Sequence, residues 1–347
     1  MSGERVQVAV RGRLGHIRLN RPSKINALDL EMIAAVRAAL SEWRGDGRIA
    51  AVLIDGAGER GLCAGGDIAA VYDGIRGDLP APQGFWADEY RMNLAIAQYP
   101  KPVVALMHGI TFGGGVGIAA HASVRVVTDS SRLAMPETAI GLAPDVGGLY
   151  LLSRAPGELG TYAALTGARL GPGDAIAAGL ADVFVPQVAF TELPRLLAAV
   201  TTADDAAAVV RRVSSPVPAS ALWPSCRPWI DECFRGDDAR EILAHLQSHP
   251  DEAARAAGAT LAGMSPTAVA VTLRAIRRAR TLSLAEVLQQ DLVLSVRFAG
   301  HHDFPEGIRA QIIDKDRNPS WTPGSLDGVT AEAVDAYFAP VPASLTL

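Results

Sequence analysis

The fold is decided by residues 101–127, which read KPVVALMHGITFGGGVGIAAHASVRVV. Residues 102–107 form a nearly continuous apolar run, which is typical of a strand buried on both faces of a sheet. Three glycines follow at 113–115, and the small residues from there to His121 predict a tightly packed helix. Residues 124–127 predict another strand. The segment therefore predicts a unit in which strands and a helix alternate around a glycine-rich loop.

The residues before this segment predict units of the same kind. Residues 6–10 and 16–19 alternate polar and apolar side chains, as in a β-hairpin. Residues 50–54 predict a buried strand, and a glycine-rich loop leads from it to a helix that begins near Asp67. Asp29 is a predicted N-cap for a helix whose apolar stripe is Leu30, Ile33, Val36, Leu40 and Trp43. This recurrence predicts an α/β fold of stacked β-β-α units.

Helical spacing prevails beyond the strand-rich part. A short strand is predicted at residues 181–185, a proline-rich linker or insertion at residues 214–229, and an irregular tail from Asn318. Helices are predicted over residues 242–246, 253–261, 268–276 and 284–298. We therefore predict an α/β body over residues 1–190, which carries the functional site, and a helical region over residues 191–347.

The composition excludes several classes of protein. The chain has 347 residues, of which 49% are hydrophobic and 20% are charged, so it is too apolar for a disordered protein. A net charge of −5 gives no electrostatic reason to expect nucleic acid or an anionic membrane as a partner. Cys63, Cys226 and Cys233 are too few for a disulfide framework and form no Cys-x-x-Cys pair. Without an apolar run typical of a signal peptide or a membrane span, the chain is expected to be cytoplasmic.

Two glycine-rich loops each lead into a predicted helix. Residues 63–67 read Cys-Ala-Gly-Gly-Asp, and residues 113–115 are the triple glycine. Free N–H groups at the start of a helix bind negatively charged oxygen. Two such groups that converged on one point would form an oxyanion hole for a carbonyl that gains negative charge. Taken alone, each loop is more often a simple turn, and that alternative stays open.

The second loop also fits a nucleotide-binding pattern. Residues 115–120 match the dinucleotide-binding sequence G-x-G-x-x-A after a strand. No acidic residue that ends a following strand stands at the expected distance, and Asp129 comes too early. A P-loop is excluded, because neither Gly-Lys-Ser nor Gly-Lys-Thr occurs. A dinucleotide-dependent oxidoreductase is therefore kept as an alternative from another class.

Two carboxylates, Glu137 and Asp145, lie within the otherwise almost wholly apolar residues 135–148. Burial raises the pKa of a carboxyl group and prepares it for acid–base work. The alternative is that both side chains cap helices or pair with arginines such as Arg125 or Arg154. The segment alone does not decide between a catalytic and a structural role.

The other polar candidates are weaker. Glu89 lies on a predicted helix and is expected to face partly toward solvent. His108 and His121 have no second histidine or carboxylate at ligand spacing, and His301-His302-Asp303 is interpreted as a polar turn at a helix end. No metal site is therefore predicted. A serine nucleophile is disfavoured, because Gly-x-Ser-x-Gly does not occur.

Together these motifs resemble the crotonase superfamily, also called the enoyl-CoA hydratase/isomerase superfamily. The stretches that carry the resemblance are Asn26-Ala27-Leu28, residues 63–68, residues 101–105 and the triple glycine. Within the superfamily the chain most resembles the 3-hydroxyisobutyryl-CoA hydrolase family, through residues 108–117, 134–142, 144–148, 165–170, 265–267 and 307–316. The resemblance covers nearly the whole chain and implies a crotonase-like spiral of β-β-α units with a helical C-terminal region.

A departure inside the superfamily separates two reactions. Hydratases that resemble this chain use two glutamates, and the first would stand where Gly117 is found. The second is retained as Glu137, and Asp145 stands where hydratases commonly have glycine, as in the hydrolase family. The resemblance thus implies hydrolysis of a short-chain 3-hydroxyacyl-CoA thioester, above all 3-hydroxyisobutyryl-CoA in valine degradation. The alternatives on the same fold are an enoyl-CoA hydratase or isomerase and a non-catalytic acyl-CoA- or RNA-binding protein, although the acidic balance argues against RNA.

The resemblance also implies roles for residues. The N–H groups of Gly66 and Gly114 would form the oxyanion hole, and Glu137 would attack the carbonyl or activate water. Asp145 would hold the 3-hydroxyl or assist proton transfer, and Glu89 would contact the acyl group. Coenzyme A would be held mostly by backbone contacts along two loops, at Asn26, Ala27, Leu28, Ala64, Gly65, Asp67 and Ile68. No metal or redox cofactor is expected, because CoA is part of the substrate, and relatives of this kind lead us to expect a homo-oligomer.

Overall fold

The computed structural model describes residues 4–77, 82–220, 222 and 225–339. The chain folds into two compact units, each assembled from separate stretches of sequence. The first unit comprises residues 1–66, 88–133 and 170–221, and the second comprises residues 67–87, 134–169 and 222–347. The boundary that the sequence predicts near residue 190 stays a prediction.

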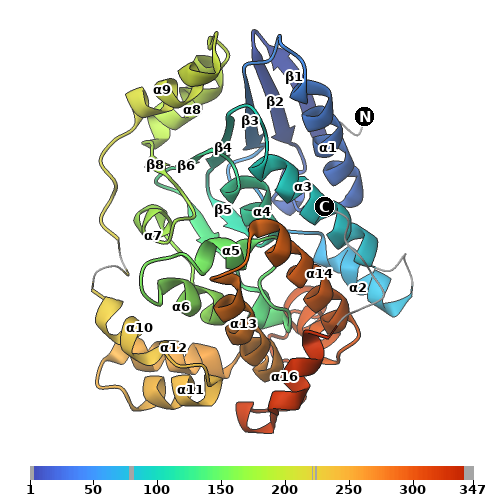
Figure 1. Ribbon diagram of the computed structural model, residues 1–347, viewed down its shortest axis with the longest axis vertical. Helices are drawn as coiled ribbons and strands as arrows, with labels where there is room; N and C mark the ends of the chain where they lie inside the picture. The colour runs from blue at the N-terminus through green and yellow to red at the C-terminus, as the bar shows by residue number, and fades with distance from the viewer. Residues whose placement is uncertain (1–3, 78–81, 221, 223–224, 340–347) are drawn as a thin grey trace. The chain divides into compact units, whose positions relative to one another are not determined.

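A mainly parallel sheet organises the first unit (Figure 1). Its strands lie in the order β1-β2-β3-β4-β6-β8, so the strand numbers rise from one edge of the sheet to the other, without β5 and β7. The first pair, β1 and β2, is antiparallel and forms the predicted hairpin, and the other pairs are parallel. The bounds are β1 (Val6–Arg11), β2 (Leu14–Leu19), β3 (Ala51–Gly56), β4 (Val103–Met107), β6 (Val124–Val127) and β8 (Val183–Phe184), with a separate pair of β5 (Ile110–Phe112) and β7 (Arg132–Ala134). The predicted α/β fold is confirmed.

Apolar side chains of this sheet pack against helices α8 (Gln187–Leu197) and α9 (Ala203–Val213). The buried cluster contains Leu14, Leu53, Val104, Leu106 and Val126 from the strands, and Phe190, Leu193, Leu197 and Val210 from the helices. Burial of this kind is the main favourable term in folding. It fixes the strands, and therefore the loops that follow their C-terminal ends.

Helix α1 (Leu30–Arg44) confirms a predicted cap and corrects one core residue. The Asp29 side chain accepts a hydrogen bond from the Met32 N–H, as expected of an N-cap. Ile33, Val36, Leu40 and Trp43 of the predicted stripe are buried, but Leu30 is 50% exposed. Leu30 is the first residue of the helix, and the buried face of α1 begins only at Met32.

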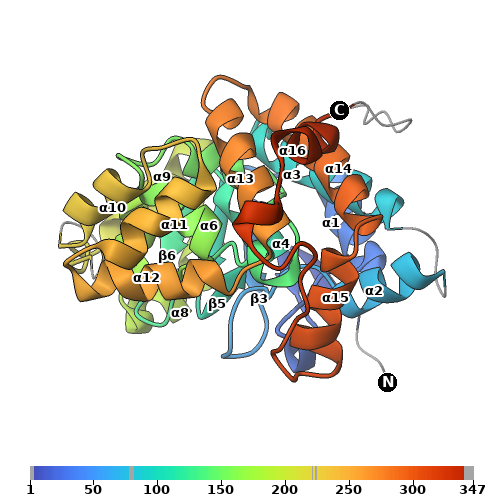
Figure 2. The same ribbon diagram turned by 90° about the horizontal axis from the view of Figure 1, so that it is seen from below.

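The second unit is mostly helical and is built around α13 (Pro266–Ala279). Ser265 caps α13 by accepting the Ala268 N–H, and the helix packs on α5 (Gly148–Leu152), α6 (Leu159–Thr166), α11 (Ala239–Ser248) and α16 (Ala331–Tyr337). Helices α11 and α12 (Glu252–Ala262) lie side by side (Figure 2). The remaining helices of this unit are α2 (Ile68–Arg76), α10 (Arg227–Cys233), α14 (Leu284–Ala299) and α15 (Asp303–Ile308).

Two sequence predictions about irregular segments hold only in part, since the described residues of 214–226 and 318–325 form no helix or strand. The tail from Asn318 contains α16, because Thr330 accepts the Ala333 N–H and so starts a helix. The predicted linker over residues 214–229 runs into α10, whose early proline at position 228 suits the first turn of a helix. Helices α3 (Gln83–Ala97) and α7 (Pro172–Ala177) are also present.

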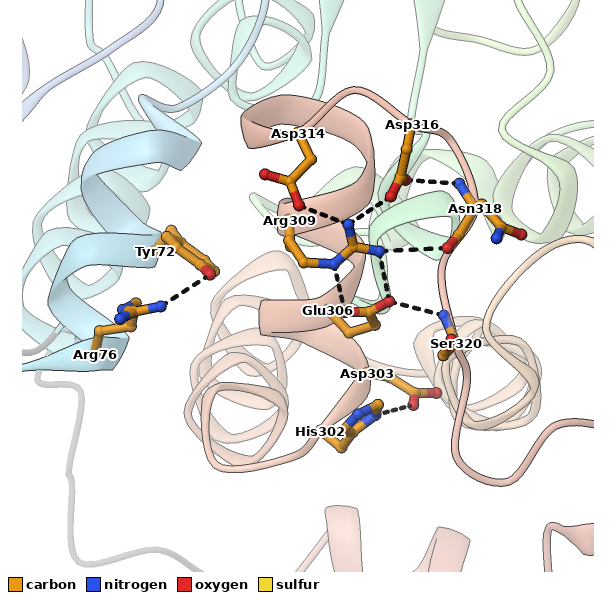
Figure 3. A network of polar contacts seen from close by, with 10 residues as sticks. All are labelled: Tyr72, Arg76, His302, Asp303, Glu306, Arg309, Asp314, Asp316, Asn318 and Ser320. Carbon is orange, nitrogen blue, oxygen red and sulfur yellow. Dashed lines mark hydrogen bonds and ion pairs between the residues drawn. The ribbon is translucent and has the colours of Figure 1, made fainter.

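A network of ion pairs centred on Arg309 links α15 to the segment that follows it in the second unit (Figure 3). The guanidinium group contacts the carboxylates of Glu306, Asp314 and Asp316 at 2.8, 2.7 and 2.6 Å. These contacts raise the pKa of Arg309, and its hydrogen bonds lower the pKa values of Glu306 and Asp316. The motif at residues 307–316 therefore serves this local fold.

Candidate active site

The loops that follow β3 and β5 meet in the first unit. Isolated bridges join Gly61 to Gly109 and Cys63 to Thr111. Gly65 has a φ of +111°, a conformation that side chains rarely adopt. A Cβ atom added to Gly115 would overlap the Cys63 carbonyl oxygen. These glycines therefore allow the two backbones to approach each other closely.

This approach brings Gly66 and Gly114 together. A Cβ atom added to Gly114 would lie 3.2 Å from the Gly66 nitrogen and would overlap Oε1 of Glu89. Gly114 is the first residue of α4 (Gly114–Ala120), where an N–H group has no acceptor within the helix. Neither nitrogen donates a hydrogen bond to another residue in the described part of the chain. Two neighbouring unused amides are what an oxyanion hole requires, and that role stays a prediction.

Asn26 holds the first of these loops in place. Its side chain is completely buried, and its Nδ2 donates to the carbonyls of Leu62 at 2.9 Å and Ala57 at 3.0 Å. Its Oδ1 accepts the Arg21 N–H at 2.8 Å. The side chain is therefore engaged inside the loop, so a contribution of Asn26 to substrate binding would come from its backbone.

Glu89 is 2% exposed, so the prediction that it faces partly toward solvent is wrong. It lies on α3 with Oε1 directed at Gly114. The neighbouring Cys63 lies in the same buried environment. Burial, with a contribution from the negative charge of Glu89, raises the pKa of the Cys63 thiol to about 12. Sequence periodicity missed this burial, because the helix turns a polar residue toward a glycine loop rather than toward an apolar core.

Glu137 begins the short helix η2 (Glu137–Ile140) of the second unit and is 6% exposed. The next residue anchors this helix: the Thr138 hydroxyl donates to the Leu165 carbonyl at 3.2 Å, and its own carbonyl accepts the Ser265 N–H at 3.1 Å. Gly141, with a φ of +73°, ends the helix. The carboxylate is therefore carried on backbone that is fixed on both sides.

Asp303 supports this arrangement from α15. It is completely buried, and its carboxylate accepts hydrogen bonds from the Ser265 hydroxyl at 2.5 Å and the Thr322 N–H at 2.8 Å. The interpretation of His301-His302-Asp303 as a polar turn at a helix end is therefore wrong for Asp303, which begins a helix and ties three segments together. In the motif Ser265-Pro266-Thr267, it is the Ser265 hydroxyl that makes this contact with Asp303.

Asp145 lies on a tight turn and is 7% exposed. The next two residues have positive φ, +51° for Val146 and +73° for Gly147. Asp291 of α14 accepts the Gly147 N–H at 2.9 Å. Burial raises the pKa of Asp291 well above its ordinary value, and the charge of Asp145 raises it further.

Sequence reasoning missed Asp291. The signal that could have found it is its place on the buried face of a helix, between Val287 and Leu294. An acidic residue in such a stripe is rarely buried unless it has a partner.

The predicted site residues belong to both units. Asn26, Ala27, Leu28, Ala64, Gly65, Gly66, Glu89 and Gly114 are in the first, and Asp67, Ile68, Glu137 and Asp145 are in the second. The structure brings Gly66, Gly114 and Glu89 together in the first unit and sets Asp291 beside the Asp145 turn in the second. Arg125 and Arg154 bind elsewhere, to the Asp182 carboxylate and to backbone carbonyls respectively.

Other kinds of site were also considered. Among the described residues no group of three or more His, Cys, Asp and Glu side chains could hold a metal ion. The sheet runs in chain order without the reversal at which dinucleotides bind, which argues against the oxidoreductase alternative. No single helix in the described ranges is long and apolar enough to cross a membrane, and the bent pair α12 and α13 would suit one by length and composition only.

Comparison with known proteins identifies the family. The enoyl-CoA hydratase/isomerase family model matches residues 14–338. The chain belongs to this family. Two solved structures share the fold over almost the whole chain: a carnitinyl-CoA dehydratase from Mycobacterium thermoresistibile (TM-score 0.94, 47% identity, 99% of both chains) and an enoyl-CoA hydratase from Rhodobacter sphaeroides 2.4.1 (TM-score 0.88, 43% identity, 97% of this chain and 98% of that chain). The crotonase-like fold implied by the sequence is confirmed.

Curated relatives in this family carry a hydrolase name. The 3-hydroxyisobutyryl-CoA hydrolase of Rattus norvegicus is 40% identical over 334 residues, which cover 94% of this chain and 87% of the relative. The human enzyme of that name is 38% identical over 343 residues, which cover 97% of this chain and 89% of the relative. The prediction that the chain is an enzyme is confirmed. Both relatives are named as mitochondrial, so the cytoplasmic location stays a prediction.

Proposed function

We propose that this chain hydrolyses a short-chain 3-hydroxyacyl-CoA thioester to the free acid and CoA, with 3-hydroxyisobutyryl-CoA as the first candidate. The names of the hydrolase relatives support the reaction and the substrate. The observation in the chain itself that carries the proposal is Gly117, buried in the middle of α4. A glycine cannot move a proton, so one of the two glutamates of a hydratase is missing.

The oxyanion hole is the first part of the proposed mechanism. Attack on a thioester carbonyl places negative charge on its oxygen, and the amides of Gly66 and Gly114 would donate to that oxygen. Backbone donors are already oriented and need no reorganisation during the reaction. Each such donor is typically worth about 3–4 kcal/mol in the barrier.

Glu137 is the second part. Its carboxylate would either attack the carbonyl carbon, expelling CoA thiolate and leaving a mixed anhydride that water hydrolyses, or take a proton from the water that attacks. Hydroxylamine distinguishes the two, because it converts an anhydride on Glu137 into a hydroxamate that peptide mass spectrometry detects. Base catalysis leaves Glu137 unmodified.

Asp145 and Glu89 would select the acyl group. Asp145 would accept a hydrogen bond from the 3-hydroxyl of the substrate. Glu89, which lies beside Gly114, would contact the acyl chain. CoA enters as part of the substrate, so the mechanism needs no separate metal or redox cofactor. Assembly into a homo-oligomer is a further proposal, which size-exclusion chromatography with light scattering would test.

An enoyl-CoA hydratase or dehydratase is the second candidate, because the two solved structures named above carry those names. A panel of acyl-CoA esters with and without a 3-hydroxyl separates the candidates. A thiol reagent measures released CoA, and enoyl absorbance measures hydration. The proposal expects thiol release from 3-hydroxyacyl esters, whereas loss of enoyl absorbance without thiol release would establish the hydratase.

A further inference from the structure

Asp291 is a buried acid that the proposed mechanism does not use. It lies on α14 and is 1% exposed, among Val287, Leu288 and Leu294. Its Oδ2 accepts the Gly147 N–H at 2.9 Å. Its Oδ1 has no hydrogen-bond partner in the part of the chain that the structure describes. An acidic residue is rarely found in such a place, since an apolar one would cost less to bury.

The backbone that Asp291 holds is strained. Val146 has a φ of +51°, a region that β-branched residues rarely adopt, and Gly147 follows with a φ of +73°. The Gly148 N–H closes the turn on the Asp145 carbonyl at 2.7 Å. Such conformations persist where the surroundings over-determine them, and they cluster at functional sites. The bond from Gly147 to Asp291 is a contact from outside the turn that holds this backbone.

The surroundings of Asp291 favour its protonated form over its charged form. Burial raises its pKa well above the ordinary value, and Asp145 is the charged group that adds to the shift. The charges on the helices packed against α14 have other partners: Asp303 and Glu306 on α15 bond to Ser265 and Arg309, and Asp335 on α16 pairs with Arg274. A neutral carboxyl has nearly the shape of a carboxamide, which makes asparagine its matched replacement.

We propose that Asp291 is a positioning residue that, through the Gly147 amide, holds Asp145 where it meets the 3-hydroxyl of the substrate. This rests on the proposed function of Asp145. The contact with substrate belongs to Asp145 alone, and Asp291 acts on the backbone two residues further along the chain. Removing the Asp291 carboxyl should therefore lower the preference for substrates with a 3-hydroxyl, and should affect the cleavage of other thioesters less.

The test compares kcat/KM for 3-hydroxyisobutyryl-CoA with that for isobutyryl-CoA. Asp291→Asn should keep the wild-type ratio within about threefold, because the amide oxygen can still accept the Gly147 N–H. Asp291→Leu should lower the ratio about tenfold or more, a shift that corresponds to the loss of one hydrogen bond. Adding Asp291→Leu to Asp145→Asn should lower it no further. The control is Gln290→Leu, which removes a neighbouring buried bond from α14 to Ala275 and should leave the ratio unchanged.

Hydrogen exchange at the Gly147 amide gives a readout that does not depend on activity. Wild type, Asp291→Asn and Gln290→Leu should protect this amide, and Asp291→Leu should expose it. If Asp291→Leu does not fold, Asp291→Ser, whose hydroxyl is too short to reach, takes its place. Wild type that cleaves neither ester overturns the proposed function but leaves the exchange test valid. The role of Asp291 is overturned if a folded Asp291→Leu or Asp291→Ser variant keeps the wild-type selectivity or the wild-type exchange at Gly147. It is also overturned if Asp291→Asn is as impaired as those variants.

Discussion

Gly114 occupies the first position of α4, where proline is well tolerated because it lacks the N–H that the helix does not use. This allows the amide to be deleted. Gly114→Pro should abolish measurable turnover, and Gly114→Ala, which suffers the same overlap with Glu89 but keeps its N–H, should be about a hundredfold or more faster than the proline variant. Steady-state kcat on folded protein checks this.

The matched control is Gly45→Ala. A Cβ atom there meets nothing within 4 Å, so that variant should match wild type. Equal kcat values for the alanine and proline variants at position 114 would show that the amide takes no part.

At the residue scale, sequence reasoning found groups whose chemistry is local. Glu137 and Asp145 stand out because they are acidic in an apolar stretch, and the structure buries both. The burial of Glu89 depends on a loop distant in the chain, so no local pattern encodes it. The helical stripe indicates that Asp291 is buried, but it does not show which backbone group Asp291 contacts. Whether the identified groups act as proposed stays a prediction.

A largely buried ion pair joins the start of helix α6 to α13. Glu158 contacts Arg277 at 2.7 Å and Arg280 at 2.9 Å. Burial alone raises the pKa of Glu158, but hydrogen bonds from Thr161 and the two arginines lower it overall. Glu158→Gln should reduce the free energy of unfolding by about 1–3 kcal/mol at pH 7.

The sign of the pH dependence follows from the lowered pKa of Glu158. Its stabilisation is complete above the unfolded-state pKa and is lost as the pH falls through the lower folded-state value. Urea titrations should therefore show the difference between wild type and Glu158→Gln at pH 7 and its decline toward pH 3. Glu192→Gln, which breaks the exposed pair with Arg195, is the control and should change stability by less than about 0.5 kcal/mol. A difference that grew as the pH fell would contradict the assignment.

At the element scale, periodicity predicted the strands of the main sheet well, since buried parallel strands are short apolar runs with clear glycine boundaries. The prediction failed where an end is decided by a single contact. Helix α16 depends on the Thr330 cap, and α10 begins inside a proline-rich stretch that reads as a linker. Helix propensity averaged over a stretch of sequence does not show where a single hydrogen bond caps a helix.

The molecule as a whole should be sensitive to acid. Hydrogen bonds lower the pKa values of Glu158, Glu306 and Asp316, so protonating these groups costs more in the folded chain than in the unfolded one. We expect the thermal midpoint to be lower at pH 3 than at pH 7, with a smaller fall in Glu158→Gln. Differential scanning calorimetry measures both, and an equal midpoint at the two pH values would contradict this expectation.

At the scale of the whole molecule, the sequence predicted the class of fold because strand, loop and helix recur, and family resemblance supplied the rest. It could not show that each compact unit combines separate segments of the chain. That division follows from the packing of residues far apart in sequence, which composition and periodicity do not contain. Gly114 lies in the first unit and Glu137 in the second. The central claim of the proposed function is that Glu137 drives cleavage of the thioester.

Single-turnover release of free thiol from 3-hydroxyisobutyryl-CoA tests that claim most directly, with wild type and Glu137→Gln measured side by side. Wild type should release CoA in step with ester consumption, and the glutamine variant should bind the ester with similar affinity but release thiol about a hundredfold to ten-thousandfold more slowly. An intact thioester in the wild-type reaction, or release by Glu137→Gln at the wild-type rate, would contradict the account.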